Sequence, residues 1–191
     1  MNFFKSYSMM FIISSLLFVL SCGNSESTSN EGSIENKSSD ILEENFSIEQ
    51  VVDNGKIYTS KDFFDSGFQE YKEYNVSKLT GSTEAWYGYW GPDEDNVKYY
   101  ELRFYPDHMT AINEGTSFAE NVTGKDAKLN RKEAMWRVGL SDRRVLKAPK
   151  INLRTGEEVV PKYYEYMIYS NLILLCQGWD TEESINNCKN L

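Results

Sequence analysis

Clustered aromatic rings are the residues of this chain best suited by type and spacing to bind a ligand. The segment 83–90 contains Trp86, Tyr87, Tyr89 and Trp90. Flat rings stack on sugars and other planar ligands, and their polar tips orient hydroxyl groups. In a strand, alternate residues point to opposite faces, so about half of these rings would fill the core. We predict that the rings left exposed form a ligand-binding surface.

Residues for acid–base or metal chemistry are sparse. His108 is the one histidine, and beside Asp107 it is expected in the first turn of a helix rather than as a general base. Without other histidines, a zinc enzyme would need three carboxylate or thiolate ligands. The acids of 93–96 alternate like the start of a calcium loop, but Lys98 and Phe104 occupy the positions where an EF-hand requires Gly and Glu. We therefore assign no catalytic residue, no metal site and no cofactor, and we expect 93–96 to be a polar hairpin turn.

The N-terminus has the features of an export signal. Lys5 precedes the apolar stretch Met9–Leu20, which is too short to span a bilayer as a helix of about twenty residues. The following segment Val19–Gly23, with sequence VLSCG, resembles the lipobox of bacterial lipoproteins. In that family the cysteine thiol receives a diacylglyceryl group, the signal is cut before the cysteine, and the new amino group is often acylated as well, with palmitate among the acyl chains. Two or more chains give stable anchoring. The resemblance implies a signal peptide over 1–21 and a lipid anchor at Cys22, on the extracytoplasmic side of a membrane in the cell envelope; the alternative is an ordinary secretory signal.

Two further cysteines, Cys176 and Cys188, are separated by eleven residues. Export would place them in an oxidising compartment, where an even number of thiols usually forms bridges. A metal site or a redox pair fits less well, because the spacing is not CxxC and His108 is distant in sequence. We predict a structural disulfide that holds the C-terminal segment against the last strand.

Acidic residues are concentrated near the N-terminus. Residues 23–50 contain seven acids and one lysine, and they have too few apolar side chains to offset the entropy of ordering. We predict a flexible acidic tether over 22–50 and one domain over 51–191. The domain has 18 Lys+Arg against 22 Asp+Glu. This near-neutral balance argues against nucleic acid as a partner, because phosphate binding requires a basic surface.

A run of basic residues lies between positions 143 and 154: Arg143, Arg144, Lys147, Lys150 and Arg154. Such a run can dock an anionic partner or lipid headgroups. More often it is a solvated loop whose charges pair with acids of the same domain. We expect the solvated loop.

Periodicity and turn residues predict the elements that position these side chains. The first half of the domain is predicted to contain a helix from Thr59 towards Gly81, paired strands at 83–90 and 97–105, and a helix from Asp107 to Gly124. A short helix at 130–140 then carries Met135, Trp136 and Leu140 inward, and an extended loop follows at 141–161. The last elements are a hairpin of strands 163–169 and 172–176 and a helix capped by Asp180. The continuous apolar run at 172–176 predicts a strand buried on both faces.

This order predicts an α+β fold, in which an antiparallel sheet of about four strands has helices packed on one face. A ferredoxin-like arrangement is the alternative. The segment 168–178, with sequence IYSNLILLCQG, and the short capped helix after it loosely resemble uncharacterised lipoproteins of environmental bacteria. That resemblance implies no activity.

Three functions remain open on these grounds. We favour a membrane-anchored, non-catalytic module that binds a small molecule, glycan or envelope protein through its aromatic surface. An envelope hydrolase of unrecognised type would need two acids converging in a cleft. A structural or assembly lipoprotein would show an exposed sheet edge or a large apolar patch.

Overall fold

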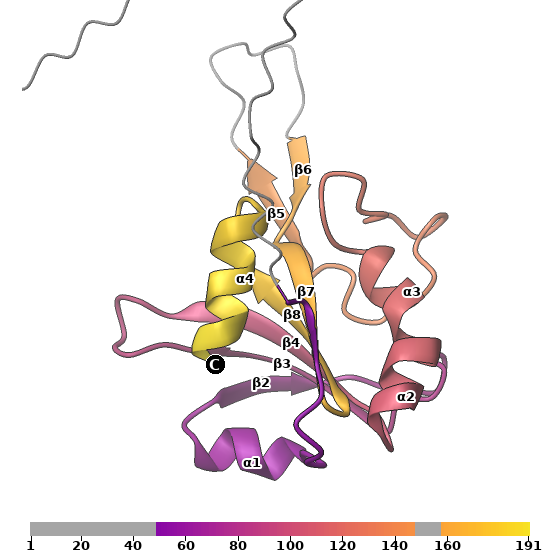
Figure 1. Cartoon of the computed structure of the whole chain (residues 1–191). Coiled ribbons are helices and arrows are strands. Elements are labelled where there is room, and N and C mark those ends of the chain that lie inside the picture. The colour runs from indigo at the N-terminus through magenta and orange to yellow at the C-terminus, as the bar shows by residue number, and fades with distance from the viewer. Residues whose placement is uncertain (1–48, 148–157) are drawn as a thin grey trace, which may run out of the picture. The chain divides into compact units, whose positions relative to one another are not determined.

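The chain folds around a mixed six-stranded sheet with helices on both faces (Figure 1). The computed structural model describes residues 49–147 and 158–191. The sheet has the order β1-β7-β8-β4-β3-β2, and β5 and β6 form a separate two-stranded sheet. The strands are β1 (Val51–Val52), β2 (Gln69–Glu73), β3 (Glu84–Trp90), β4 (Lys98–Phe104), β5 (Arg144–Lys147), β6 (Glu158–Pro161), β7 (Tyr163–Tyr169) and β8 (Leu172–Gln177). The helices are α1 (Ser60–Asp65), α2 (His108–Thr110), the π-helix η1 (Ala111–Gly115), α3 (Thr116–Glu120) and α4 (Thr181–Asn190).

The two predicted hairpins form the centre of the sheet. Strands β3 and β4 pair antiparallel, and Asp93 organises their turn by accepting hydrogen bonds from the Asp95 amide and the Asn96 side chain. Strands β7 and β8 also pair antiparallel, through a turn in which Ser170 has a φ of 51°. The Asn171 side chain secures this turn: it accepts a hydrogen bond from the Tyr58 amide and donates to the carbonyl oxygens of Tyr58 and Tyr105. The β4–β8 pairing then joins the two hairpins into one sheet.

The predicted first helix is wrong beyond its first two turns. Helix α1 ends at Asp65, and the chain continues through Gly67 into β2, which pairs antiparallel with β3 at the sheet edge. Gly67 has a φ of 101°, a conformation that glycine adopts at little cost and that interrupts a helix. The aromatic spacing therefore reflects burial on two different faces, because Phe68 and Tyr74 belong to different buried clusters.

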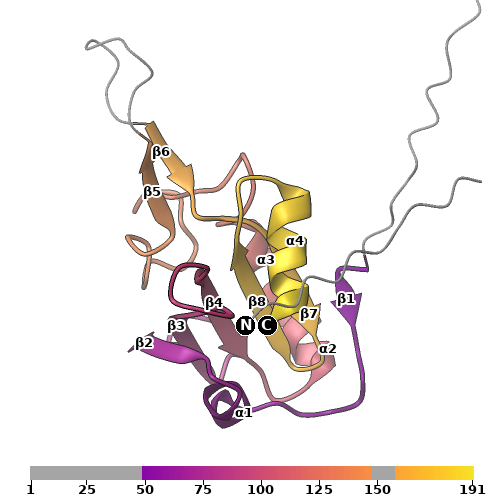
Figure 2. The same ribbon diagram turned by 90° about the vertical axis from the view of Figure 1, so that its left-hand side faces the viewer.

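Helices cover both faces of the sheet rather than one. Phe63 of α1 and Cys188 of α4 pack with Leu102 and Leu174 on one face. On the opposite face, Ala111, Ala119 and Val122 pack with Ile173 and Leu175. Figure 1 shows α4 to the left of the central strands and α2 and α3 to their right, and in Figure 2 α4 lies in front of these strands. Both rows of side chains on β4 and β8 are therefore buried, as the apolar sequence of β8 predicts.

The helix predicted from Asp107 is present, with a change of winding in its middle. The Asp107 side chain accepts a hydrogen bond from the Thr110 amide at 2.7 Å, which starts α2. The chain then widens into η1, which ends at Gly115. A Cβ at this position would lie 2.5 Å from both the Tyr105 hydroxyl and Ile173. Glycine therefore allows the helix to approach β4 and β8 closely.

The segment between α3 and β7 differs from the prediction in two ways. Residues 130–140 form turns instead of a helix; Trp136 and Leu140 are buried as expected, but Met135 is exposed. The predicted loop at 141–161 contains the paired strands β5 and β6. The order of elements also differs from the βαββαβ of ferredoxin-like folds. The α+β class is confirmed, but the ferredoxin-like alternative is not supported.

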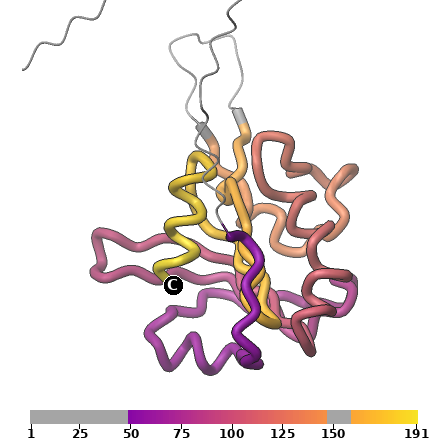
Figure 3. The backbone as a smooth tube through the Cα atoms, in the orientation of Figure 1, coloured from indigo at the N-terminus to yellow at the C-terminus, as the bar shows by residue number. Residues whose placement is uncertain are grey.

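The C-terminal helix and the disulfide are both confirmed. Asp180 caps α4 by accepting a hydrogen bond from the Glu183 amide at 2.8 Å. The bond between Cys176 and Cys188 joins β8 to this helix. The tube in Figure 3 follows the described chain from β1, which runs parallel to β7, to its end beside the sheet. Of the helices in 49–147 and 158–191, none is long and apolar enough to cross a bilayer.

Candidate ligand-binding site

A pocket of about 510 Å³ lies between α1, α4 and the face of the sheet that these helices cover. Small-molecule sites are usually concave, largely apolar and about 300–1,000 Å³ in volume. The residues that line it are Lys56, Tyr58, Asp62, Phe63, Ser66, Met167, Tyr169, Leu174, Cys188, Lys189 and Leu191. We call it the α1–α4 pocket.

The floor of the pocket is apolar and held by the core. Met167 and Leu174 come from neighbouring positions on β7 and β8, where they pair in register. Phe63 enters from α1 and packs edge-on against Phe104 at 5.8 Å between ring centroids. Cys188 enters from α4, where the disulfide fixes its position. The floor is therefore preformed by contacts that do not depend on a ligand.

A pair of tyrosines forms one wall. The rings of Tyr58 and Tyr169 lie 5.5 Å apart between centroids. The Asn54 side chain donates hydrogen bonds to both hydroxyl groups, at 2.8 and 2.9 Å. The Lys56 ammonium lies 4.9 Å from the centre of the Tyr58 ring, within the range of a cation–π contact. Asn54 thus holds two aromatic faces beside a cation.

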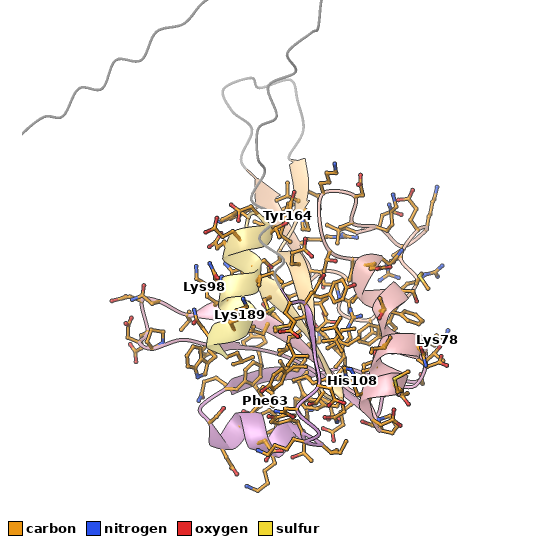
Figure 4. The ribbon with its side chains drawn as sticks, in the orientation of Figure 1. Phe63, Lys78, Lys98, His108, Tyr164 and Lys189 are labelled. Carbon is orange, nitrogen blue, oxygen red and sulfur yellow. A yellow bond between two sulfur atoms is a disulfide. The ribbon has the colours of Figure 1, made fainter. Side chains whose placement is uncertain are left out.

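The charged side chains at the mouth of the pocket are two lysines and one aspartate. Asp62 is the one acidic side chain among the described lining residues, and it accepts hydrogen bonds from the amide and hydroxyl of Thr59 at the start of α1. These bonds lower the pKa of Asp62 and commit its charge to the helix end. Lys56 and Lys189 remain as two ammonium groups at the mouth. Phe63 and Lys189, labelled in Figure 4, come from the two helices that flank the pocket.

The four aromatic residues proposed from sequence do not form one site. Trp86 and Trp90 lie half-buried on the face that α1 covers, where they border the same core as the pocket. Trp86 packs edge-on against Phe64 at 5.1 Å and donates a hydrogen bond to Glu84 at 3.0 Å. These two rings are therefore part of the margin of the core, beside the α1–α4 pocket but outside its lining.

Tyr87 and Tyr89 lie on the opposite face, in a group that we call the tyrosine–lysine patch: Tyr71, Tyr87, Tyr89, Tyr99 and Lys162. The rings of Tyr87 and Tyr99 stack at 5.7 Å, and the Lys162 ammonium lies 4.7 and 4.8 Å from their centres. Lys162 also donates a hydrogen bond to the Tyr87 hydroxyl at 2.7 Å. Burial lowers the pKa of Lys162 and raises that of Tyr87. The patch is a second group of aromatic residues, on the opposite face of the sheet from the α1–α4 pocket.

His108 has a structural partner. Its Nδ1 donates a hydrogen bond to the Ser170 carbonyl at 2.7 Å, which links α2 to the β7–β8 turn. It is half-buried rather than fully exposed. Within the part of the chain that the structure describes, no three His, Cys, Asp or Glu side chains are grouped so that they could hold a metal ion.

Three buried charges form a cluster that the sequence patterns did not predict. Glu101, Arg103 and Arg143 have no exposed surface, and we call them the buried charge cluster. Arg143 holds both oxygens of Glu101, with Nε and Nη2 donating at 2.7 and 2.8 Å. Arg103 Nε donates to the same carboxylate at 2.8 Å. Arg143 pairs with an acid of its own domain, as expected. The expectation that it is solvated is wrong, because the chain after Trp136 folds over the sheet and carries this side chain inward.

One signal in the sequence could have pointed to this burial. Glu101 and Arg103 alternate with apolar residues, which suggests a solvated face, but Tyr99 and Tyr105 extend the same row. Large aromatic residues at both ends of a charged row indicate that the row is covered. Of the other basic residues in the predicted run, Arg144 is half-buried and donates to the Leu129 carbonyl at 2.6 Å. Lys150 and Arg154 lie outside the described residues.

Comparison with known proteins adds one relationship. A model of the DUF6810 family, described as a family of unknown function, matches residues 59–191. The chain belongs to this family. No curated protein matches it, and neither does any solved structure. The family region begins at the cap of α1 and includes the buried charge cluster, both cysteines of the disulfide and most of the pocket lining, whereas Lys56 and Tyr58 precede it. The predicted signal peptide, Cys22 and most of the predicted tether lie outside the described residues.

Proposed function

We propose that this DUF6810 protein is an extracytoplasmic module, anchored to a membrane through lipid on Cys22, that binds a small ligand in the α1–α4 pocket without transforming it. The observation that carries this proposal is the pocket itself. Its apolar floor is preformed, its wall is a tyrosine pair held by Asn54, and its mouth carries two lysines.

The lining favours a ligand with an apolar or aromatic body and an anionic group. Phe63, Met167 and Leu174 offer an apolar floor to the body. Lys56 and Lys189 can approach an anionic group at the mouth, because the charge of Asp62 is already engaged at the start of α1. Binding would bury the ligand body between rigid walls, so little of its affinity would be lost to ordering the protein.

Binding without catalysis fits the chemistry of the carboxylates. A hydrolase that acts on envelope polymers would need two acids on either side of the scissile bond. The described lining of the pocket contains one acidic side chain, Asp62, and its carboxylate is engaged by the amide and hydroxyl of the cap residue Thr59. Glu101 is held by two guanidinium groups, which leaves it unsuited to exchange a proton with a substrate.

The disulfide supports the proposed location. Disulfides persist in oxidising, extracytoplasmic compartments and are rare where thiols are kept reduced. The bond between Cys176 and Cys188 is therefore consistent with export. Incorporation of labelled palmitate in bacterial cells would test the anchor; Cys22→Ser is expected to abolish the label and release the protein from the membrane fraction. Label retained on Cys22→Ser would refute the anchor.

The ligand proposal is tested by thermal unfolding of the purified protein against aromatic and aliphatic carboxylates, organic phosphates and neutral sugars. A ligand at a hundredfold excess over its dissociation constant should stabilise the protein by ~2.7 kcal/mol. Lys56→Ala/Lys189→Ala should weaken an anionic ligand at least about tenfold, or ~1.4 kcal/mol. Lys61→Ala, on α1 but outside the pocket lining, is the matched control. A flat response to the whole panel would refute a small-molecule role.

The same measurement separates the pocket from the aromatic surfaces. Tyr89→Ala changes the tyrosine–lysine patch, whereas Trp86→Ala and Trp90→Ala change the margin of the core on the other face. If the ligand is lost with Tyr89→Ala but retained with Lys56→Ala/Lys189→Ala, the site is the patch. If a tryptophan variant folds and loses binding, that ring contacts the ligand; if it unfolds, the ring belongs to the core.

A role in assembly is the second candidate, and one observation favours it. Leu146 of β5 and Val159 of β6 are paired in register and are 61% and 45% exposed. Contiguous exposed apolar surface marks sites of contact with another protein, and these two side chains would lie at the centre of such a surface. Crosslinking in the native membrane, compared between wild type and Leu146→Ser, would detect such a partner. An unchanged crosslinking pattern would count against this surface.

A further inference from the structure

The buried charge cluster carries an unbalanced positive charge. Two guanidinium groups, from Arg103 and Arg143, face the single carboxylate of Glu101, and all three side chains are fully buried. Arginine side chains keep their charge in proteins. Leaving a unit charge uncompensated in the interior is strongly unfavourable.

Neighbouring acids do not restore the balance. Asp142, the neighbour of Arg143 in sequence, already accepts hydrogen bonds from Tyr74 at 2.7 Å and Lys72 at 3.2 Å. Lys162, which is partly buried, adds another positive charge on the same face of the sheet. The Glu114 side chain is exposed to solvent. The protein interior around Arg103 is therefore positive.

The same region contains donors that lack acceptors. Both terminal nitrogens of Arg103, the Trp136 indole nitrogen and the hydroxyl groups of Tyr105 and Tyr163 are buried and have no hydrogen-bond partner among the described residues. Buried polar groups without partners are rare, and each one costs free energy. The two guanidinium groups lie against the Trp136 ring, at 5.2 Å for Arg103 and 4.6 Å for Arg143. The charge of Arg103 also acts on the Tyr105 hydroxyl, and that of Arg143 acts on Tyr163. Unpaired donors and excess positive charge thus coincide.

We propose that the buried charge cluster, with Trp136 and Tyr105, binds one small monovalent anion such as chloride, held mainly by the Arg103 guanidinium. Water could accept these hydrogen bonds, but it would leave the charge uncompensated. An anion satisfies both requirements, because it accepts hydrogen bonds from N–H and O–H donors and neutralises the second arginine. This site lies on the opposite face of the sheet from the α1–α4 pocket and does not depend on the proposed function.

The test compares thermal unfolding of the purified, oxidised protein in sodium chloride and in sodium gluconate at equal ionic strength. Specific binding predicts a saturable rise of the unfolding temperature in chloride, roughly 5–10 °C at a hundredfold excess over the dissociation constant. Crystals grown in sodium bromide should show an anomalous peak within hydrogen-bond distance of Arg103. Equal unfolding temperatures in the two salts at every concentration, with no bromide peak, would overturn the proposal and assign the site to water.

Tyrosine-to-phenylalanine variants test whether chloride binds beside the buried charge cluster. Tyr105→Phe removes one donor and should weaken chloride binding severalfold while the domain stays folded. Tyr100→Phe is the matched control, because this buried hydroxyl faces the other side of β4 and donates to the Asn187 carbonyl at 3.1 Å. A loss of chloride affinity in Tyr100→Phe as large as in Tyr105→Phe would also overturn the proposal.

Discussion

Replacement of Glu101 by Gln tests the charge balance of the buried cluster most directly. The substitution preserves the shape of the side chain but removes the only carboxylate among the three buried charges. Glu101 accepts three hydrogen bonds from the two guanidinium groups, at 2.7 to 2.8 Å. Breaking a buried ion pair by removing one partner typically costs about 3–5 kcal/mol, because the remaining charge is left unpaired. We expect a loss of this size, which is a large part of the ~5–15 kcal/mol available to a domain.

Urea unfolding followed by circular dichroism measures this loss. The midpoint should fall while the slope with denaturant stays constant, which shows that stability rather than compactness has changed. Glu73→Gln, on the exposed edge strand β2, should change stability by less than about 0.5 kcal/mol.

A second variant separates charge from packing. Glu101→Leu/Arg103→Met/Arg143→Met removes all three charges and keeps much of the volume, so it should recover most of the stability that Glu101→Gln loses. If Glu101→Gln costs less than about 1 kcal/mol, or if the triple variant is as unstable as the single one, the charge argument is refuted.

Three further predictions concern pH, the disulfide and the helix contact. Burial alone would raise the pKa of Glu101, but Arg143 and Arg103 outweigh it and hold the pKa below its ordinary value of 4.5. A group whose pKa is lowered by folding stabilises the folded protein at pH values above its unfolded-state pKa, and this stabilisation is lost on acidification. The stability of the wild type should therefore fall below about pH 4.5, and that of Glu101→Gln should respond less to pH. Reduction of the disulfide, which joins positions 12 residues apart, should lower the free energy of unfolding by about 3 kcal/mol; Cys176→Ala/Cys188→Ala should show no response to reductant in the same urea titration. Gly115→Ala would favour an ordinary helix by about 1 kcal/mol, but its Cβ would lie 2.5 Å from the Tyr105 hydroxyl, so thermal unfolding should show a loss. A gain in stability would contradict this close contact.

Local signals predicted the elements that depend on neighbouring residues. The Asp180 cap starts α4, the Ser170–Asn171 turn joins β7 to β8, and the spacing of Cys176 and Cys188 indicated a disulfide. The first helix was wrong because its aromatic spacing fits a helix as well as a helix followed by a strand. The backbone at Gly67 decides between them, and that conformation depends on the pairing of β2 with β3.

The candidate sites depend on contacts between distant parts of the chain. The α1–α4 pocket joins Tyr58 to Tyr169 across more than a hundred positions, and Asn54 holds them together. Trp86 and Tyr87 are neighbours in sequence, but the pleat of β3 directs them to opposite faces.

The sequence by itself determined the α+β class, the central hairpins, the capped terminal helix and the disulfide, because each rests on residues whose conformational preferences are local. Only the tertiary structure decided which faces are covered. Glu101 alternates with apolar neighbours as a solvated residue would, yet the segment after Trp136 folds back over β4 and brings Arg143 to it. Burial of this carboxylate is a property of the assembled fold, because it requires a charge partner that lies 42 positions away in the chain.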